Sequence, residues 1–357
     1  MSNLTTTLVI IEKQSQKEIL EKSNVFIDYL TDKEYDFLET LSFVPFTFKY
    51  PKNIKYKEYP KSNNLEYKLN SSLVNFNQKI LNQYEKLNKD YLLSFDELFL
   101  APDFDHTGIY SVYLILENIL GPDWKSLFKK IHYLKFISFD KKTINNEILQ
   151  VIFDDNYNSS IEKKFDRLYE YAKIKRYFEY NYNINSNIFF KEVFVKLINS
   201  YINKEDDFFK NRISSLIEGE IPTFTKYIIM TFHIIAEDFN YNVKLNDLLS
   251  YIQKYEGSGK YSEYTNCSIG SPASVGLIIK RLEELALIDI SDKGLVRFTD
   301  LGIRFHSLLH NKTFDIDLPF RIKNWCSSNF NEAIIGIDKY IYRYFSYQKA
   351  KNKFLIK

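Results

Sequence analysis

The first third of the chain alternates short apolar runs with amphipathic stretches. Leu8 to Ile11 is apolar and β-branched, as is typical of a buried strand, and Ser15 to Lys22 has the spacing of a helix. Asn24 to Leu30 is predicted to form a second strand, and Leu98 to Ala101 the next buried one. Ile109 to Leu120 is apolar on all sides, which indicates a buried helix. Strands that alternate with helices predict a parallel α/β sheet.

Three other segments of this region carry weaker patterns. Residues 45 to 72 are polar and rich in Lys, Tyr, Asn and Pro, which predicts a loop insertion. Leu73 to Leu87 places its apolar residues on one helical face, and Tyr133 to Phe139 alternates loosely, which predicts an edge strand. These patterns place an α/β domain at residues 1–155.

The remainder of the chain, residues 156–357, is predicted to be mainly helical. Helical apolar spacing already begins before that boundary and recurs in Thr143 to Ile152, Ile161 to Tyr180, Ile188 to Ile202, Phe224 to Phe239 and Leu245 to Tyr255. A helix at Ala273 to Leu285 is then followed by two short strands, Leu287 to Ile290 and Leu295 to Phe298, and by a helix from Asp300. This order is the pattern of a winged-helix module, at about residues 243–310.

Composition excludes some classes of protein and leaves others open. The net charge is only +2, so no overall field attracts a polyanion, and nucleic-acid binding would need local basic patches. Cys267 and Cys326 are far apart, which argues against a disulfide framework and a zinc site and fits a reducing, cytoplasmic compartment. The first residues lack the features of a signal peptide, and no apolar run is long enough to span a membrane, so no membrane association is expected.

Acidic residues stand where two predicted strands end. Glu12 follows the first strand, and Asp103 and Asp105 follow a later one. If the two strands are neighbours, three carboxylates converge at the edge where open α/β sheets bind ligands. Such carboxylates repel one another unless a cation neutralises them, and oxygen ligands suit Mg²⁺. Gly108 would allow a tight turn into the next helix. The alternative is that Asp103 and Asp105 are turn and N-cap residues.

Two stretches resemble the Toprim domain of type IA DNA topoisomerases. "TLVIIEKQSQKEIL" is similar to the opening strand and helix of that domain, and "LAPDFDHTGIYSVYLILENIL" to its second motif. The resemblance implies that Glu12 acts in acid/base chemistry at the scissile phosphate and that Lys13 contacts that phosphate. It also implies that Asp103 and Asp105, with Glu12, bind Mg²⁺, and that residues 1–155 form a Toprim domain.

Weaker similarity continues toward the C-terminus and points to DNA, expected to be single-stranded. "YEYAKIKRYFEY" resembles a family helix whose arginine, here Arg176, would face DNA. "GSPASVGLIIKRLEEL" resembles a late segment that touches the DNA backbone, which implies contacts from Ser271 and Ser274. Lys280 and Arg281 lie on the predicted recognition helix and could contact phosphates, or they could pair with the glutamates that follow on a solvated face.

The chain also departs from the family pattern. The positions of the usual arginine and third acid hold His106 and Thr107. His106 could contact a phosphate or donate a proton, or it could be a capping or surface residue. No tyrosine is followed by the family's Arg-Thr-Asp-Ser motif, and the stretch between Arg176 and Gly270 is too short for the arch domains. A protein partner could supply the missing functions.

Three functions therefore stay open: a reduced topoisomerase-like protein, a Mg²⁺-dependent Toprim nuclease without a covalent intermediate, and a non-catalytic DNA-binding scaffold. Two further features carry alternatives of their own. The C-terminal run "YIYRYFSYQKAKNKFLIK" interleaves basic and aromatic residues, which suits single-stranded nucleic acid or a helix that packs its rings on the body. His306 and His310 are four residues apart and could share a metal, but a solvated face is the favoured interpretation.

Overall fold

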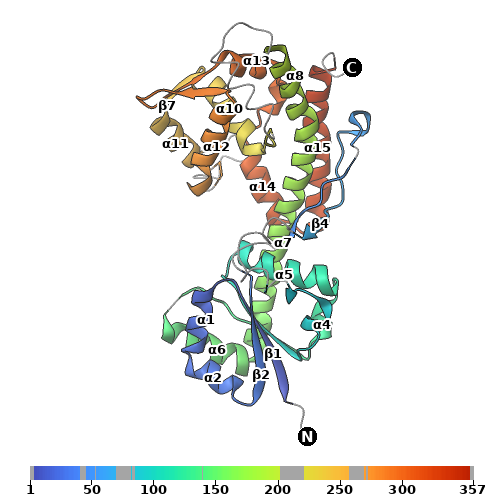
Figure 1. The fold of residues 1–357 in the computed structure, drawn as a ribbon, viewed down its shortest axis with the longest axis vertical. Helices are drawn as coiled ribbons and strands as arrows, with labels where there is room; N and C mark the ends of the chain where they lie inside the picture. Colours follow the sequence, from blue (N-terminus) through green and yellow to red (C-terminus); the bar gives the residue numbers. More distant parts are fainter. Residues whose placement is uncertain are drawn as a thin grey trace. The chain divides into compact units, whose positions relative to one another are not determined.

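The chain forms two compact units, each of which is described here by itself. One unit comprises Met1–Lys49 and Glu66–Lys173, and the other Tyr50–Leu65 and Ile174–Lys357 (Figure 1). The computed structural model describes residues 4–40, 46–52, 54–69, 82, 85–138, 140–201, 221–256, 269–270 and 272–353.

A four-stranded sheet forms the centre of the first unit. Its strands are β1 (Thr5–Ile11), β2 (Lys33–Glu39), β5 (Glu97–Ala101) and β6 (Lys130–Tyr133). They lie in the order β2-β1-β5-β6, and every neighbouring pair is parallel. The predicted parallel α/β sheet is therefore confirmed, and β1 and β5 are direct neighbours.

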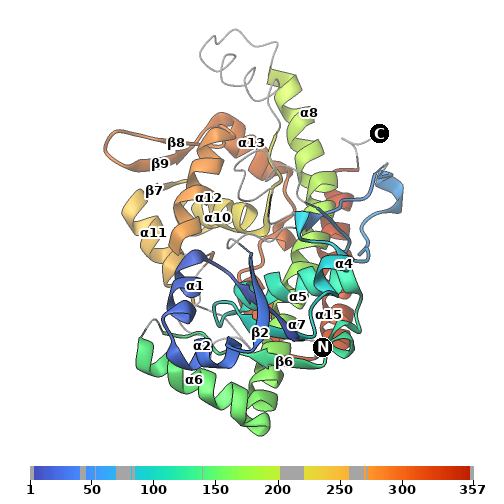
Figure 2. The same ribbon diagram turned by 60° about the horizontal axis from the view of Figure 1, so that its bottom comes forward.

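Helices cover both faces of this sheet (Figure 2). Leu8 and Ile10 of β1 pack on one face against a cluster that includes α5 (His106–Leu120) and the first part of α7 (Asp155–Ser186). The alternate residues of β1 point to the other face, and the elements packed there are α1 (Gln14–Glu21), α2 (Asn24–Leu30) and α6 (Lys141–Phe153). Burial on both faces explains why the strand is a continuous apolar run.

Two strand predictions were wrong. Asn24–Leu30 is helix α2, because the Ser23 hydroxyl caps it by accepting a hydrogen bond from the Phe26 amide and because Phe26 and Leu30 bury one helical face. The second strand is instead β2, whose first residues are polar and largely exposed at the sheet edge. The edge strand β6 occupies Lys130–Tyr133 rather than the predicted Tyr133 to Phe139.

The predicted loop insertion contains a little regular structure. β3 (Phe46–Phe48) and β4 (Tyr67–Leu69) pair antiparallel, and a short 3-10 helix, Tyr56–Glu58, lies between them in sequence. The predicted helix at Leu73 to Leu87 falls mostly outside the described residues. The described residues of the first unit also form two short elements, α4 (Lys89–Leu92) and a 3-10 helix at Trp124–Leu127.

The second unit is mainly helical, as predicted. Helix α7 continues from the first unit into it, and the boundary between Lys173 and Ile174 lies inside this helix. The following elements are a π-helical turn (Asn187–Lys191), α8 (Glu192–Tyr201), α10 (Lys226–Glu237), α14 (Leu318–Ser327) and α15 (Phe330–Lys351). No helix in the described ranges is long and apolar enough to cross a membrane.

A small antiparallel sheet and its helices complete the second unit. The sheet has the order β7-β9-β8, so the strand that comes last in sequence lies in the middle. The predicted hairpin strands are present at nearly the predicted positions. The elements in chain order are β7 (Asn242–Lys244), α11 (Leu245–Gln253), α12 (Pro272–Glu284), β8 (Ile288–Ile290), β9 (Leu295–Phe298), α13 (Asp300–Leu308) and a 3-10 helix at Asn311–Thr313.

Candidate functional site

The carboxyl ends of β1 and β5 form the candidate site. β2 lies on one side of β1 and β5 on the other, so the chain reverses its direction of winding between β1 and β5. Open α/β sheets bind ligands in the crevice outside the strand ends at such a point. Glu12 directly follows β1, and Asp103 comes two residues after β5.

The Glu12 side chain lies against the turn that contains Asp103. It is only 8% exposed, and its Oε2 accepts a hydrogen bond of 3.2 Å from the Asp103 amide. Gly108 permits this approach, because a Cβ there would lie 2.7 Å from both the Asp103 carbonyl oxygen and Glu12 Oε2. Glu12 therefore lies at the PDFD turn, as neighbouring strands predicted, and its contact there is with the Asp103 backbone amide; the sharing of one ion by three carboxylates stays a prediction.

Lys13 and Gln16 occupy both carboxylate oxygens of Asp103. Lys13 Nζ lies 2.6 Å from Oδ2, and Gln16 Nε2 donates to Oδ1 at 2.8 Å. The buried Gln16 also accepts from the Glu12 amide at 2.7 Å through its Oε1, which fixes the turn after β1. The sequence analysis missed Gln16. Its position four residues after Glu12, on the first turn of the helix that follows, was the signal that could have identified it.

The Lys13 ammonium lies among three carboxylates. Its hydrogen bond to Asp103 raises the pKa of Lys13 against the opposing effect of burial, and the charges of Asp103, Glu12 and Asp105 act in the same direction. The group has three carboxylates and one ammonium. Carboxylate oxygens are ligands that suit Mg²⁺. Among the described residues, no three His, Cys, Asp or Glu side chains stand as a ready metal-binding group. An ion that took Asp103 as a ligand would have to displace Lys13.

Asp105 caps helix α5. Its Oδ1 accepts hydrogen bonds from the amides of Thr107 at 2.8 Å and Gly108 at 2.9 Å, so the capping interpretation is confirmed for this residue. His106 is the first residue of α5, and its half-buried ring lies 5.6 Å from the ring of Tyr171 on α7.

Four of the residues predicted to contact DNA, Arg176, Ser274, Lys280 and Arg281, belong to the second unit. Arg176 is on α7, and its guanidinium lies 3.4 Å from Glu179 Oε2. Lys280 and Arg281 on α12 lie 3.9 Å and 2.7 Å from Glu284, so both pair on their own helix as in the solvated-face interpretation.

The segment before α12 is described only in part. Ser271 lies outside the described residues. Ser274 is half-buried on the first turns of α12, and a Cβ at Gly270 would lie 2.8 Å from its hydroxyl oxygen.

Tyr251, Tyr255, Tyr261 and Tyr264 lie near the place that the family's nucleophilic tyrosine has in chain order. The two that the structure describes, Tyr251 and Tyr255, do not have an environment that favours a nucleophile. Burial raises the pKa of Tyr251 to about 12, helped by its hydrogen bond to Asp238, and burial also raises the pKa of Tyr255. Raised pKa values disfavour the phenolate that attacks a phosphodiester. Tyr261 and Tyr264 lie outside the described residues.

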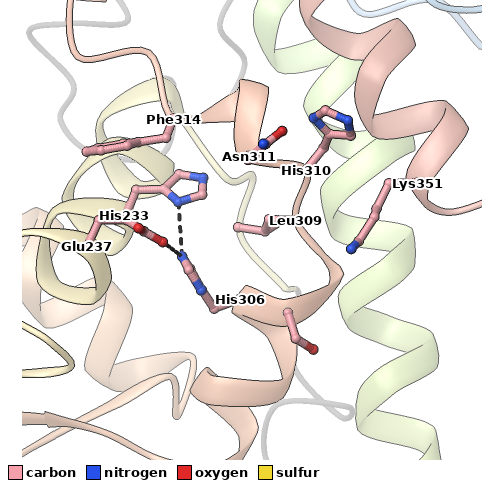
Figure 3. Close-up of a pocket in the computed structure, with 9 residues that line it drawn as sticks. His233, Glu237, His306, Leu309, His310, Asn311, Phe314 and Lys351 are labelled. Carbon is pink, nitrogen blue, oxygen red and sulfur yellow. Dashed lines mark hydrogen bonds and ion pairs between the residues drawn. The ribbon is translucent and has the colours of Figure 1, made fainter.

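A second polar cluster joins α10 and α13 inside the second unit (Figure 3). His233 Nε2 lies 3.1 Å from Thr313 Oγ1, which itself donates to the His310 carbonyl oxygen, so His233 is the donor there. His233 Nδ1 must then accept from His306 Nε2 at 3.1 Å, and this same His306 nitrogen lies 3.4 Å from Glu237 Oε1. The solvated-face interpretation of His306 and His310 was wrong, because His306 faces His233 and His310 lies beyond α13. Sequence analysis missed the contact because His233 lies on another helix.

This cluster predicts a pH dependence of stability. Burial and the neighbouring His306 lower the pKa of His233 to about 3, whereas the unfolded chain has a value of about 6.5. Below about pH 6.5 the His233 imidazole binds a proton in the unfolded state but not in the folded state. The free energy of unfolding therefore falls as the pH drops toward 3. We expect His233→Asn to remove a slope of up to about 1.4 kcal/mol per pH unit, measured by urea unfolding at several pH values. An unchanged slope in this variant would contradict the assignment.

No protein-family model and no curated protein matches this chain. Its class is therefore defined by the fold and the site alone. The first unit is a parallel α/β sheet with acidic residues and a lysine at the β1–β5 strand ends. The second is a mainly helical unit with a small antiparallel sheet.

Proposed function

We propose that the first unit is a Toprim-like domain and that the chain is a reduced type IA topoisomerase-like protein that acts on single-stranded DNA with Mg²⁺. One observation carries the proposal: the Glu12 carboxylate accepts the amide of Asp103 at the ends of two neighbouring parallel strands. The topological position of this contact, between β1 and β5, supports a ligand site there.

The residues of the cluster have complementary chemistry for a phosphodiester. Glu12 would exchange a proton with the leaving or attacking oxygen, and its burial keeps water away from that step. Lys13 would move from Asp103 to a phosphate oxygen and stabilise its developing charge. Asp103 and Asp105, with Glu12, would hold Mg²⁺, which would supply further neutralisation of the phosphate. His106 at the start of α5 would contact the phosphate or donate a proton.

The second unit supplies the proposed DNA contacts. A helix pair followed by a hairpin, with the sheet order β7-β9-β8, supports a winged-helix-like module. α12 would then be its recognition helix, with the exposed Lys280 and Arg281 and with Ser274 at its start. Ser271 and Arg176 complete the proposed set.

Hydrolysis without a covalent intermediate is the second candidate. The chain has no tyrosine followed by Arg-Thr-Asp-Ser, and burial raises the pKa of Tyr251 and Tyr255. The same acidic site could then activate water instead of receiving a tyrosine. In the third candidate, a non-catalytic scaffold, the Lys13–Asp103 ion pair would persist and the protein would only bind DNA.

A single gel separates these candidates. Labelled single-stranded DNA is incubated with the full chain and Mg²⁺, and both nicked DNA and DNA covalently attached to protein are measured. We expect Glu12→Gln and Asp103→Asn each to lower the cleavage rate by about 100-fold or more, because each removes a group that acts on the reacting phosphate. Glu18→Gln, an exposed position on α1, is the matched control and should leave the rate unchanged.

Each result assigns the chain to one candidate. Protein covalently attached to the DNA supports the topoisomerase-like function. If no attachment is found, the assay is repeated with a protein partner that supplies a tyrosine. Nicking without attachment supports the nuclease. DNA binding that is insensitive to EDTA and to Asp103→Asn, with no nicking, supports the scaffold. A chain that fails to bind DNA at all would refute the proposed function.

A further inference from the structure

A pocket of about 460 Å³ lies within the second unit, lined by residues of α14, α15 and the segment before α14. Aromatic rings form much of its lining. The Trp325 and Tyr340 rings are 5.4 Å apart at 67°, and Tyr347 joins them along α15. All three side chains are half-buried, so their rings are held in place while part of their surface remains open. The volume is in the range of pockets that hold small ligands.

Gly336 allows α15 to pack closely against the Trp325 ring of this lining. A Cβ at this position would lie 2.8 Å from Trp325 Nε1 and 3.2 Å from its Cδ1, so only glycine allows α15 to pass this close to the indole. The lining is therefore built into the packing of α14 against α15.

Positive charges surround the rings. Lys312, Lys339 and Arg343 line the pocket and are exposed, and in the described part of the chain none of them pairs with a carboxylate. A fourth cation, Arg321, is already held by Asp315 at 3.1 Å. Three uncompensated cations next to aromatic rings make a surface that complements an anion with a flat, stacking group.

The electrostatic effect of these cations is visible on a neighbouring group. Arg343 Nε donates to the Tyr347 hydroxyl oxygen at 3.3 Å, and this bond and the charge of Arg343 lower the pKa of Tyr347, with a smaller contribution from Lys312. A phenol that is easier to ionise reports a positive potential at the pocket rim, which would attract a phosphate.

α15 can present this face because it packs on the body with another. Its buried residues include Ile337, Ile341 and Phe345, whereas Lys339 and Arg343 are exposed. The two alternatives for the basic, aromatic C-terminal run are thus compatible: one face of the helix packs and the other lines the pocket.

We propose that this pocket binds a nucleotide of single-stranded nucleic acid, with the base against Trp325 and Tyr347 and a flanking phosphate on Lys339 and Arg343. Aromatic rings beside cations are the combination that single-stranded nucleic acid requires, since rings stack on bases and cations take the phosphates. An acidic peptide would form ion pairs with the cations but would not stack on the rings. The inference rests on the proposed binding of single-stranded DNA and adds a contact site for it, which uses no residue of the strand-end site.

The test uses the full chain and a fluorescein-labelled oligothymidylate, with binding followed by fluorescence anisotropy. We expect Lys339→Gln with Arg343→Gln to weaken binding about tenfold or more and to reduce the slope of log K against log salt by about 0.7, for the one phosphate that the two cations contact. The pair Lys323→Gln and Lys353→Gln removes the same charge from exposed positions that do not line this pocket, and should change binding little.

A second pair of variants tests the ring. Tyr347→Leu is expected to weaken binding about tenfold, whereas Tyr347→Phe keeps the stacking face and should bind like the wild type. Oligouridylate tested in parallel identifies the preferred sugar, and binding of either strand supports the proposal. The proposal would be overturned if the pocket variants and the control charge variants lost the same affinity. It would also be overturned if polyglutamate or anionic vesicles displaced the labelled strand as effectively as unlabelled oligothymidylate does. Cleavage by the strand-end site is measured separately, so a protein that binds oligothymidylate through this pocket without cleaving it would support this site and refute the proposed cleavage.

Discussion

Gly302→Ala is expected to destabilise the protein by about 3 kcal/mol or more, because no room exists for the added methyl group. A Cβ at this buried position on α13 would overlap the Leu287 carbonyl oxygen and lie 3.0 Å from its carbonyl carbon. The obstacle is backbone, which cannot rotate away as a flexible side chain would. The Leu287 oxygen also accepts hydrogen bonds from Thr299, so a shift of the strand would disturb the start of α13 as well. Urea unfolding followed by circular dichroism measures the loss.

Gly276→Ala is the matched control on helix α12. Nothing lies within 4 Å of a Cβ built at Gly276, which is exposed. Alanine is better than glycine inside a helix by about 0.5–1 kcal/mol, so this variant should be slightly more stable than the wild type. Similar losses in both variants would show that the contact between α13 and Leu287 is not as described.

Lys226→Met is expected to cost about 3–5 kcal/mol, because it removes the nearer of the two cations that pair with a buried carboxylate. Lys226 Nζ lies 2.9 Å from Glu179 Oε1, and the side chains are only 5% and 19% exposed. Burial alone would raise the pKa of Glu179, but the charges of Lys226, Arg176 and Lys175 together hold it below its ordinary value. Without Lys226 this pKa should rise, so the variant should lose less stability in acid than at neutral pH. Unfolding at about pH 5 and about pH 7.5 tests both expectations.

An exposed pair gives the comparison for this prediction. Lys280 Nζ lies 3.9 Å from Glu284 Oε1, and the two side chains are 68% and 40% exposed. Water already screens this pair, so Lys280→Met should change stability by no more than about 0.5 kcal/mol. If Lys226→Met had an equally small effect, Glu179 would have to be solvated rather than buried against Lys226.

The elements with the strongest sequence signals were predicted well. Leu8 to Ile11 and Leu98 to Ala101 are buried on both faces, so their apolar runs are continuous and identify β1 and β5. The acidic residues that follow them could be placed at one edge, because the ends of parallel strands coincide. The approach of Glu12 to the Asp103 turn was therefore predictable from the chain.

Contacts decided by packing or by distant residues were not predictable. The apolar residues of Asn24 to Leu30 fit a strand or a helix, and the Ser23 cap together with the packing of Phe26 and Leu30 decides for the helix. The engagement of Asp103 by Lys13 and Gln16 depends on the turn after β1, which no periodicity encodes. His233 contacts His306 only because α10 and α13 pack together, and the sequence of neither helix indicates this contact.

Helix α7 belongs to both units, which limits how the chain can be cut into fragments. The backbone passes between the two units at residues 49–50, 65–66 and 173–174, and the last passage lies within this 32-residue helix. A fragment that stopped at Lys173 would expose a turn of carbonyl oxygens without amide partners and would still carry Tyr50–Leu65, which belongs to the other unit. Neither half can be excised as one continuous, self-sufficient piece. Each site is therefore studied in a polypeptide that contains both units.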